Sequence, residues 1–336
     1  MRCTRRAGLP VGPPWPARRR DARAEYTGPY HAPRNQRPQY GLIGYRKRMK
    51  SSDSADSRTT SEPTSAAAQA RQVVRIRAYG RDGFSARDDT LAVERALEIH
   101  VAGADPLITM RTPGADAELA AGLMHGEGVI RSRDDIVYLR PAPGEDDVMR
   151  LMLKPEARAR LDRVERNTLA TSACGVCGKP SFSPPTPGND GSAASGPGQV
   201  TPELLLSLPE RMRADQGVFD ATGGLHAAGL FDARGTLLSI REDVGRHNAL
   251  DKLIGAALLE NRLPLSDGIV MLSGRASYEL LQKSVMAGVP IVCAVSAPSS
   301  YAVALAEQFG VTLVGFLRGH RFNVYTHPQR LAGVDD

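Results

Sequence analysis

Two cysteines three residues apart are the groups best suited to chemistry in this sequence. Cys174 and Cys177 lie in the glycine-containing run from Thr171 to Lys179, and they are two of only four cysteines in the chain. The glycines give the run backbone freedom, and the positive charge of Lys179 favours the thiolate form of a nearby cysteine. A thiolate attacks sulfur or binds a metal, so the run indicates sulfur, redox or metal chemistry.

Four kinds of site are open for this pair. A structural zinc site wants four cysteine or histidine ligands, and no second C-x-x-C motif is present. A thioredoxin-like redox pair is expected after a first strand, not in the middle of a chain. A persulfide carrier would take a sulfane sulfur on Cys174 and pass it on. A zinc deaminase is the fourth kind of site. His125 and Glu127, followed by the two cysteines, imitate its H-x-E…C-x-x-C signature. The alternative interpretation of His125 and Glu127 is that they end a helix of the first lobe.

Four segments follow predicted strands or precede predicted helices, where free backbone N–H groups attract anions. They are residues 241–248, 273–277, 296–300 and 316–321. Arg246, Arg275, Arg318 and Arg321 within them could pair with phosphates. A single such segment is more often an ordinary helix cap, but four at one sheet edge favour a nucleotide-like or diphosphate ligand. None matches a Walker loop or the dinucleotide glycine fingerprint.

Two histidines have both a chemical and a structural interpretation. His226 could orient or protonate a sulfur leaving group, or it could be a hydrogen-bonded structural residue of a strand. His247 is first a polar group at a helix N-terminus, with a chemical role as the alternative.

The elements that must position these residues form two lobes on either side of the cysteine run. An α+β N-terminal lobe is expected over 71–165, with strands at 73–79, 91–101, 107–110, 136–139 and 148–153. Thr112 and Pro113 predict a helix start, and the helix would bury Leu119, Leu123 and Met124 before it frays at 126–128. Residues 166–200 hold the cysteines and a Pro-, Gly- and Ser-rich stretch, which is typical of a flexible linker.

The C-terminal lobe is expected over 201–330. An amphipathic helix from 201 leads to a hairpin of 225–231 and 236–240, and the chain then alternates helix and strand. Helices are predicted at 246–261, 277–287 and 301–309, and strands at 268–272, 290–295 and 311–316. This alternation predicts an α/β fold with a mostly parallel, doubly wound sheet, in which ligands bind beyond the carboxyl ends of the strands.

Charge and composition separate a tail from this folded part. Residues 1–50 carry 13 Lys and Arg against Asp21 and Glu25, a net of +11, so the other residues sum to +6 − 11 = −5. The Arg/Pro/Ser-rich tail over 1–70 is predicted to be disordered. It is an RNA-binding or targeting arm, or an upstream extension before a true start at Met49. No long apolar run or leader is visible, so we expect a cytoplasmic protein with reduced cysteines and without a nucleic-acid or membrane partner.

Together these segments resemble one family, the formate dehydrogenase accessory sulfurtransferases of the FdhD/NarQ family. The resemblance covers residues from about 71 to 330. Its matching segments are 110–114, 118–120, 127–130, 172–179, 222–228, 241–252, 273–275 and 316–325, and the long string 241–252 is highly specific.

The resemblance implies a fold similar to cytidine deaminases, with a three-layer domain and a smaller α+β lobe. It implies a sulfurtransferase that acts as a persulfide carrier. Such a protein receives sulfur from an IscS-type cysteine desulfurase and transfers it to the molybdenum cofactor Mo-bis(molybdopterin guanine dinucleotide) for formate dehydrogenase. Cys174 matches the persulfide-forming cysteine and Cys177 its assisting partner. The cofactor-contacting residues would be Phe316, Leu317, Arg318, Gly319, His320 and Arg321, with no metal ligand and a homodimeric assembly. A non-catalytic chaperone that binds the cofactor is the alternative.

Overall fold

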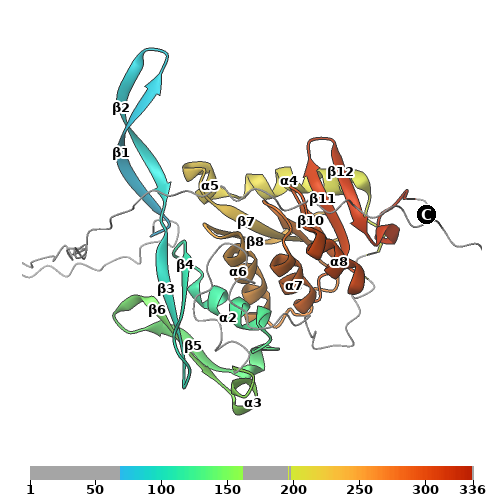
Figure 1. Ribbon diagram of the computed structural model, residues 1–336, viewed down its shortest axis with the longest axis horizontal. Coiled ribbons are helices and arrows are strands. Elements are labelled where there is room, and N and C mark those ends of the chain that lie inside the picture. The colour runs from blue at the N-terminus through green and yellow to red at the C-terminus, as the bar shows by residue number, and fades with distance from the viewer. Residues whose placement is uncertain (1–68, 162–195, 197, 335–336) are drawn as a thin grey trace, which may run out of the picture. The chain divides into compact units, whose positions relative to one another are not determined.

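Hydrogen-bonded strands form three sheets, and each has a different environment. The computed structural model describes residues 69–161, 196 and 198–334, and all structural statements below concern these residues (Figure 1). The cysteine run and nearly all of the predicted tail lie outside them. The lobe boundaries at 165 and 200 therefore stay predictions.

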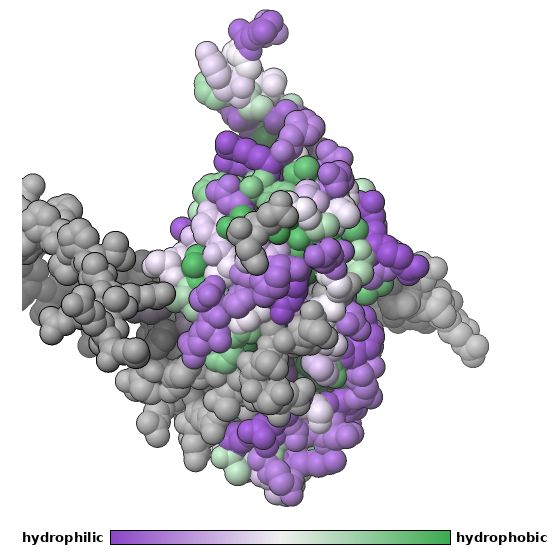
Figure 2. Space-filling model, turned by 90° about the vertical axis from the view of Figure 1, so that its right-hand side faces the viewer, coloured by the Kyte–Doolittle hydropathy of each residue, from purple (hydrophilic) through white to green (hydrophobic). Residues whose placement is uncertain are grey.

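The first sheet is a two-stranded hairpin, β1 (Arg71–Gly80) and β2 (Gly83–Ala92), paired along its whole length. The sequence predicts β1 but not β2, and it wrongly extends one strand over 91–101. β2 has few apolar residues to alternate, so pairing with β1 rather than burial makes it a strand. Tyr79 and Phe84 pack against each other at the tip and remain 78% and 75% exposed. Hydrophilic and hydrophobic residues mix on the surface at the top of Figure 2.

The second sheet carries the N-terminal lobe, in the order β4-β3-β6-β5. Its strands are β3 (Arg95–Val101), β4 (Leu107–Arg111), β5 (Ile136–Ala142) and β6 (Glu145–Leu153). The 3-10 turn η1 (Arg133–Asp135) and the short helix α3 (Pro155–Arg158) flank β5 and β6. Inward residues such as Leu97, Ile99 and Leu151 pack with the helix α2 (Asp116–Gly126) in one core.

The start of α2 corrects the sequence prediction. The helix begins at Asp116, after Ala115 in the left-handed region, and not at Thr112 and Pro113. Thr112 cannot cap it, because its N–H donates to Asp243 and its hydroxyl accepts from the Val244 N–H. The end of the helix at Gly126 is as predicted.

The third sheet has six strands in the order β12-β11-β10-β9-β7-β8. They are β7 (His226–Phe231), β8 (Leu237–Asp243), β9 (Ile269–Leu272), β10 (Ile291–Ala294), β11 (Thr312–Arg318) and β12 (Arg321–Thr326). β9, β10 and β11 are parallel, as predicted, whereas β7 runs antiparallel to β9 and β8, and β12 antiparallel to β11. β12 was not predicted, because its apolar residues are few and half-buried.

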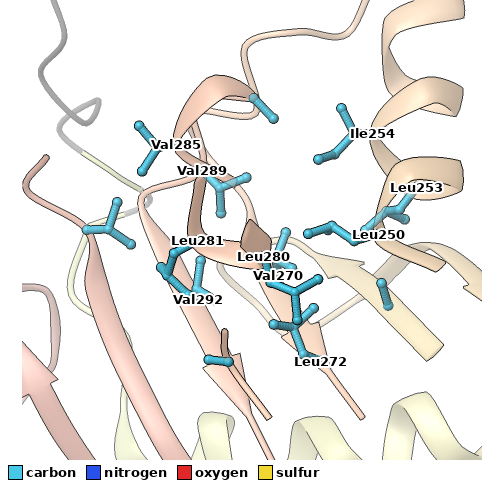
Figure 3. Packing of buried hydrophobic residues seen from close by; sticks show 14 of the residues in the cluster. Leu250, Leu253, Ile254, Val270, Leu272, Leu280, Leu281, Val285, Val289 and Val292 are labelled. Carbon is cyan, nitrogen blue, oxygen red and sulfur yellow. The ribbon is translucent and has the colours of Figure 1, made fainter. Parts of the chain in front are cut away.

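Helices cover both faces of this sheet, which gives three layers (Figure 1). On one face lie α6 (Arg246–Leu259), α7 (Tyr278–Met286) and α8 (Ser300–Gln308). On the other face lies α4 (Pro202–Ala214), which is followed in the chain by α5 (Gly217–Thr222). The 3-10 turn η3 (Pro328–Arg330) lies near the C-terminus. In β9, Val270 and Leu272 join the α6–α8 core, while Ile269 and Met271 join the α4 core. Figure 3 shows Leu250, Leu253 and Ile254 of α6 facing the first pair. Burial on both faces explains the unbroken apolar runs, and the α/β prediction is confirmed.

The two lobes meet backbone to backbone where α2 crosses α6. A Cβ added to Gly255 would lie 1.8 Å from the carbonyl oxygen of Glu118, and one added to Gly122 would lie 1.8 Å from that of Asp251. Only glycine allows helices to approach so closely. None of the helices in the described part of the chain is both long and apolar enough to cross a membrane.

Candidate functional site

The segments at the carboxyl ends of three parallel strands are joined to one another at one edge of the large sheet. The Ser296 N–H donates to the Gly274 carbonyl, and the Phe316 N–H donates to the Ser296 carbonyl, both over 3.2 Å. Ala276 and Pro298 form a further bridge between the first two loops. The structure thus brings the predicted segments 273–277, 296–300 and 316–321 to this edge, which is where a ligand of such a sheet is expected.

The segment 316–321 is the end of the β11–β12 hairpin. Arg318 and Arg321 are its last pair, and the turn between them holds Gly319 at a φ of 59°. Arg318, Gly319, His320 and Arg321 are exposed. Leu317 is fully buried in the α4 core, so its side chain anchors the hairpin and does not face a ligand from solution.

Phe316 has an unusual backbone. Its φ is 55° although it is not glycine, and it lies in an irregularity of the β11–β12 ladder. Such conformations are sparsely populated and cluster at binding sites. The Arg318 guanidinium lies 5.9 Å from the centre of the half-buried Phe316 ring, so an aromatic face and a cation are presented together.

A cleft of about 620 Å³ opens at the same edge of the sheet, on the side of α4 and α5. Its lining includes Arg213 of α4, Phe219 of α5, His226 at the start of β7, Ser273 after β9 and Val295 after β10. The Arg213 guanidinium lies 4.3 Å from the centre of the Phe219 ring and pairs with Asp220. The cleft therefore combines an apolar wall with a few polar groups, as small-molecule sites do.

The wall formed by α5 is fixed from the sheet. The Glu242 carboxylate of β8 accepts from the N–H groups of Val218 and Phe219, over 3.0 and 2.8 Å. Arg71 donates to the Gly217 carbonyl, which ties the base of the β1–β2 hairpin to the same helix. These bonds give α5 the partners that its own six residues cannot supply.

His226 lines this cleft. No hydrogen bond joins either of its ring nitrogens to another group of the residues that the structure describes. It stands directly opposite Asp243 in the β7–β8 ladder. Burial lowers the pKa of His226, the positive charge of Arg246 lowers it further, and Asp243 opposes both. Among the residues that the structure describes, none supplies the hydrogen bond that the structural interpretation of His226 expects.

Most of the specific segment 241–252 points instead into the contact between the lobes. Asp243 is fully buried, and its carboxylate accepts from the N–H groups of Thr112 and Gly245 and from Asn248. The Lys252 ammonium lies 2.7 Å from the same carboxylate and donates to the Thr112 carbonyl. These residues, which we call the interlobe network, hold the lobes together and are not available to a ligand.

A second group of buried ionisable side chains extends from α6 to α7. His247 lies 3.3 Å from both the Ser277 hydroxyl and the Glu279 carboxylate. Lys283 contacts both carboxylate oxygens of Asp251, at 2.8 and 2.9 Å. Burial lowers the pKa of His247 to about 4 despite the opposing effect of Glu279. Burial would also lower the pKa of Lys283, but attraction to Asp251 outweighs it and raises the value, so this lysine stays charged.

His125 has the structural position at the end of a helix that was the alternative to a zinc site. It ends α2, and its two ring nitrogens lie 2.9 and 3.2 Å from the carbonyl oxygens of Ile130 and Met286. With both nitrogens directed at carbonyls, His125 is not placed to bind a metal. Among the described residues there is no group of three metal-ligating side chains.

The remaining predicted residues differ in how exposed they are and in whether the structure describes them. Arg275 is exposed and Arg246 is half-buried on the first turn of α6. Cys174 and Cys177 lie outside the described residues. Cys293 is free and buried in β10, and burial raises the pKa of its thiol to about 12, so it is not a nucleophile.

The fold and site define a class: a three-layer α/β protein with an added α+β lobe and a cleft at the carboxyl ends of its parallel strands. The model of the FdhD/NarQ family matches residues 92–332, and the chain belongs to this family.

Relatives from several organisms extend this match. The chain is 51% identical over 271 residues to the sulfur carrier protein FdhD of Streptomyces coelicolor, covering 78% of this chain and 95% of the relative. It is 43% identical over 256 residues to the protein of the same name from Sulfolobus acidocaldarius, covering 75% and 95%. The fold is similar to a crystal structure described as that of a candidate formate dehydrogenase accessory protein from Desulfotalea psychrophila, with a TM-score of 0.60, 24% identity, and coverage of 78% of this chain and 99% of that chain.

Proposed function

We propose that this protein is a cytoplasmic sulfur carrier that serves the maturation of formate dehydrogenase. The observation that carries the proposal is its extensive identity to relatives named sulfur carrier protein, over nearly their whole length. The presence of Cys174 and Cys177 in the chain supports it, since thiolates are the groups that accept and donate sulfane sulfur.

In the proposed loading step, the Cys174 thiol attacks the terminal sulfur of a persulfide on a cysteine desulfurase. A new S–S bond forms on Cys174, the S–S bond of the donor breaks, and the donor leaves as a thiol after taking one proton. Cys177 assists this cysteine. The carried sulfur is then delivered to the molybdenum cofactor Mo-bis(molybdopterin guanine dinucleotide), which is the substrate. In this step the Cys177 thiol attacks the Cys174 sulfur, a Cys174–Cys177 disulfide forms, the persulfide S–S bond breaks, and the terminal sulfur leaves as sulfide, so the two cysteines supply the two electrons.

We place contact with that substrate at the hairpin end 316–321. Four of its six residues are exposed, and Arg318 stands over the Phe316 ring, so the hairpin can offer an aromatic face and two arginines to a guanine and its phosphates. Guanosine diphosphate is a suitable probe. We expect calorimetry to show weaker binding for Arg318→Ala and Arg321→Ala than for Arg150→Ala, an exposed arginine of β6.

The carrier function is tested by mass spectrometry after incubation with a cysteine desulfurase and cysteine. The peptide that contains Cys174 should gain the mass of sulfur in the wild type and in Cys177→Ala, but not in Cys174→Ala. In cells that lack the wild-type protein, Cys174→Ala should not restore formate dehydrogenase activity. Full restoration would favour a cofactor-binding chaperone instead. Light scattering tests the proposed homodimer.

A further inference from the structure

A buried glutamine lines the cleft, and its side chain bonds to none of the residues that the structure describes. Gln216 lies between α4 and α5, is 4% exposed and belongs to the lining of the cleft. No hydrogen bond joins its amide to another described residue, and neither amide atom is sealed from solvent. Buried polar side chains are nearly always hydrogen-bonded, so this amide is available to a molecule bound in the cleft.

The usual role of a polar residue at this position is taken by another side chain. Gln216 is the N-cap of α5, where a side chain normally accepts from the first N–H groups of the helix. Its amide makes no such bond. The Glu242 carboxylate accepts from the N–H groups of Val218 and Phe219 instead. Glu242 therefore fixes the helix and leaves the Gln216 amide to a ligand.

The cleft and the hairpin end 316–321 differ in charge. The cleft holds Arg213, but this guanidinium pairs with Asp220, and Glu210 adds a negative charge to the lining. The hairpin end has two arginines and no acidic residue. The cleft thus suits the uncharged part of a ligand, whereas the hairpin end suits its anionic part.

One molecule can reach both places. Val295 at the end of β10 lines the cleft, and the carbonyl of the next residue, Ser296, accepts from the Phe316 N–H. Neighbouring strands lie about 4.8 Å apart, so a single strand spacing separates this wall of the cleft from the start of the hairpin end. A nucleotide is long enough to place its base in the cleft and its phosphates on the arginines.

The cleft offers the contacts that a planar base needs. Phe219, Leu225 and Val295 form apolar walls, against which the faces of a ring can pack. A glutamine amide carries an acceptor oxygen beside its N–H donors. It can therefore make two hydrogen bonds to a base edge in which a carbonyl adjoins an N–H. Guanine, the base of the substrate in the proposed function, has such an edge.

We propose that Gln216 binds the guanine base of the substrate, with the base in the cleft and its phosphates at the hairpin end. This inference rests on the proposed function, which supplies a guanine dinucleotide as the substrate. The Nε2 group of Gln216 donates to the base carbonyl, and Oε1 accepts from the adjacent N–H. Gln216 acts in recognition of the substrate and not in sulfur transfer.

The test compares guanosine diphosphate with inorganic pyrophosphate, because only the first ligand has a base. Calorimetry measures both with the full-length wild type and with Gln216→Leu, which keeps the apolar bulk but has no amide. The control is Gln308→Leu, an exposed glutamine at the end of α8. We expect Gln216→Leu to bind guanosine diphosphate about 10-fold more weakly and pyrophosphate within about 2-fold of the wild type, since two hydrogen bonds to the base are lost. Gln308→Leu should bind both ligands as the wild type does.

Further measurements separate recognition of the base from a structural role. Arg318→Ala should weaken both ligands, since both carry phosphates. In NMR spectra, the side-chain amide of Gln216 should shift on addition of guanosine diphosphate but not of pyrophosphate. If Gln216→Leu is less stable in urea than the wild type, Gln216→Met, which is unbranched like glutamine, takes its place in the comparison.

Several results would overturn the inference. Binding of guanosine diphosphate by Gln216→Leu as tightly as by the wild type would do so, and it would leave the contact at the hairpin end intact. An equal loss for both ligands in Gln216→Leu and Gln216→Met would make Gln216 a structural residue only. A wild type that binds neither ligand would instead defeat the proposed contact at 316–321, and the role of Gln216 with it. Sulfur loading of Cys174, measured by mass spectrometry, tests the carrier function separately.

Discussion

His226 and Asp243 are direct neighbours in one ladder, yet they belong to two very different polar regions. Asp243 is fully buried and receives bonds from backbone, amide and ammonium donors of both lobes. His226 lines a cleft and receives none from the described residues. The polar groups of the interlobe network bond to one another and so contribute order, whereas the cleft holds an imidazole that bonds to none of the described residues.

The largest expected effect is at the centre of the interlobe network. Asp243→Ala leaves Lys252 buried without its partner, and breaking such a pair costs about 3–5 kcal/mol. Urea unfolding should show a loss of this size. The control is Asp88→Ala, since the exposed Asp88–Arg75 pair should contribute less than about 1 kcal/mol. Equal losses in the two variants would mean that Asp243 is not a special position.

Gly255→Ala tests whether the lobes are joined by backbone contact. The added methyl group meets the Glu118 carbonyl, so α2 and α6 must separate; overpacking of this kind costs about 1–3 kcal/mol. Gly80→Ala is the matched control, because nothing lies within 4 Å of a Cβ there. If both variants have wild-type stability in urea, the close crossing is not present in solution.

The pH dependence of stability should identify His247 as part of the buried region. The unfolded chain binds a proton on this histidine near pH 6.5, but the folded chain resists it until about pH 4. The free energy of unfolding should therefore fall as the pH falls from 6.5 towards 4, by about 1–2 kcal/mol at pH 5 for this group. His247→Gln should lack that part of the loss in urea titrations at pH 7 and pH 5; an identical slope would contradict it.

The smallest effect on stability should come from the cleft. Because His226 has no polar partner among the described residues, His226→Gln should change the free energy of unfolding by no more than about 0.5 kcal/mol at pH 7. Thermal and urea unfolding measure this directly. A loss comparable to that of Asp243→Ala would erase the difference between the two regions.

Sequence patterns predicted the elements that are buried on both faces. The runs that became β9, β10 and β11 and their helices are apolar and evenly spaced, so period and length identify them. The sequence patterns did not predict the polar strand β2 or the half-buried strand β12, because pairing with a neighbouring strand, and not burial, makes them strands. The sequence also did not predict the contact of Gly122 with α6, since it joins residues more than a hundred positions apart.

The placement of the strand-end segments was predicted in part. The sequence correctly brought the loops 273–277, 296–300 and 316–321 to one edge, because parallel strands end together. It treated 241–248 as facing a ligand, although Asp243 and Asn248 are buried between the lobes. Only tertiary structure shows which side of that segment faces inward. A charged residue within an apolar helix pattern, such as Asp251 or Lys252 in α6, was the available signal for a buried ion pair.

The β1–β2 hairpin has a consequence for solubility. Its two strands pair only with each other, so among the described residues both outer edges keep unpaired backbone groups. Exposed edges of this kind invite other chains to add a strand, and charged side chains discourage it. Arg75, Arg77, Arg87 and Asp88 are exposed along the hairpin, beside the exposed Val73, Tyr79 and Phe84. We expect these charges to oppose aggregation through the hairpin edges. Replacing these charges would leave the fold intact and still make the protein harder to keep in solution.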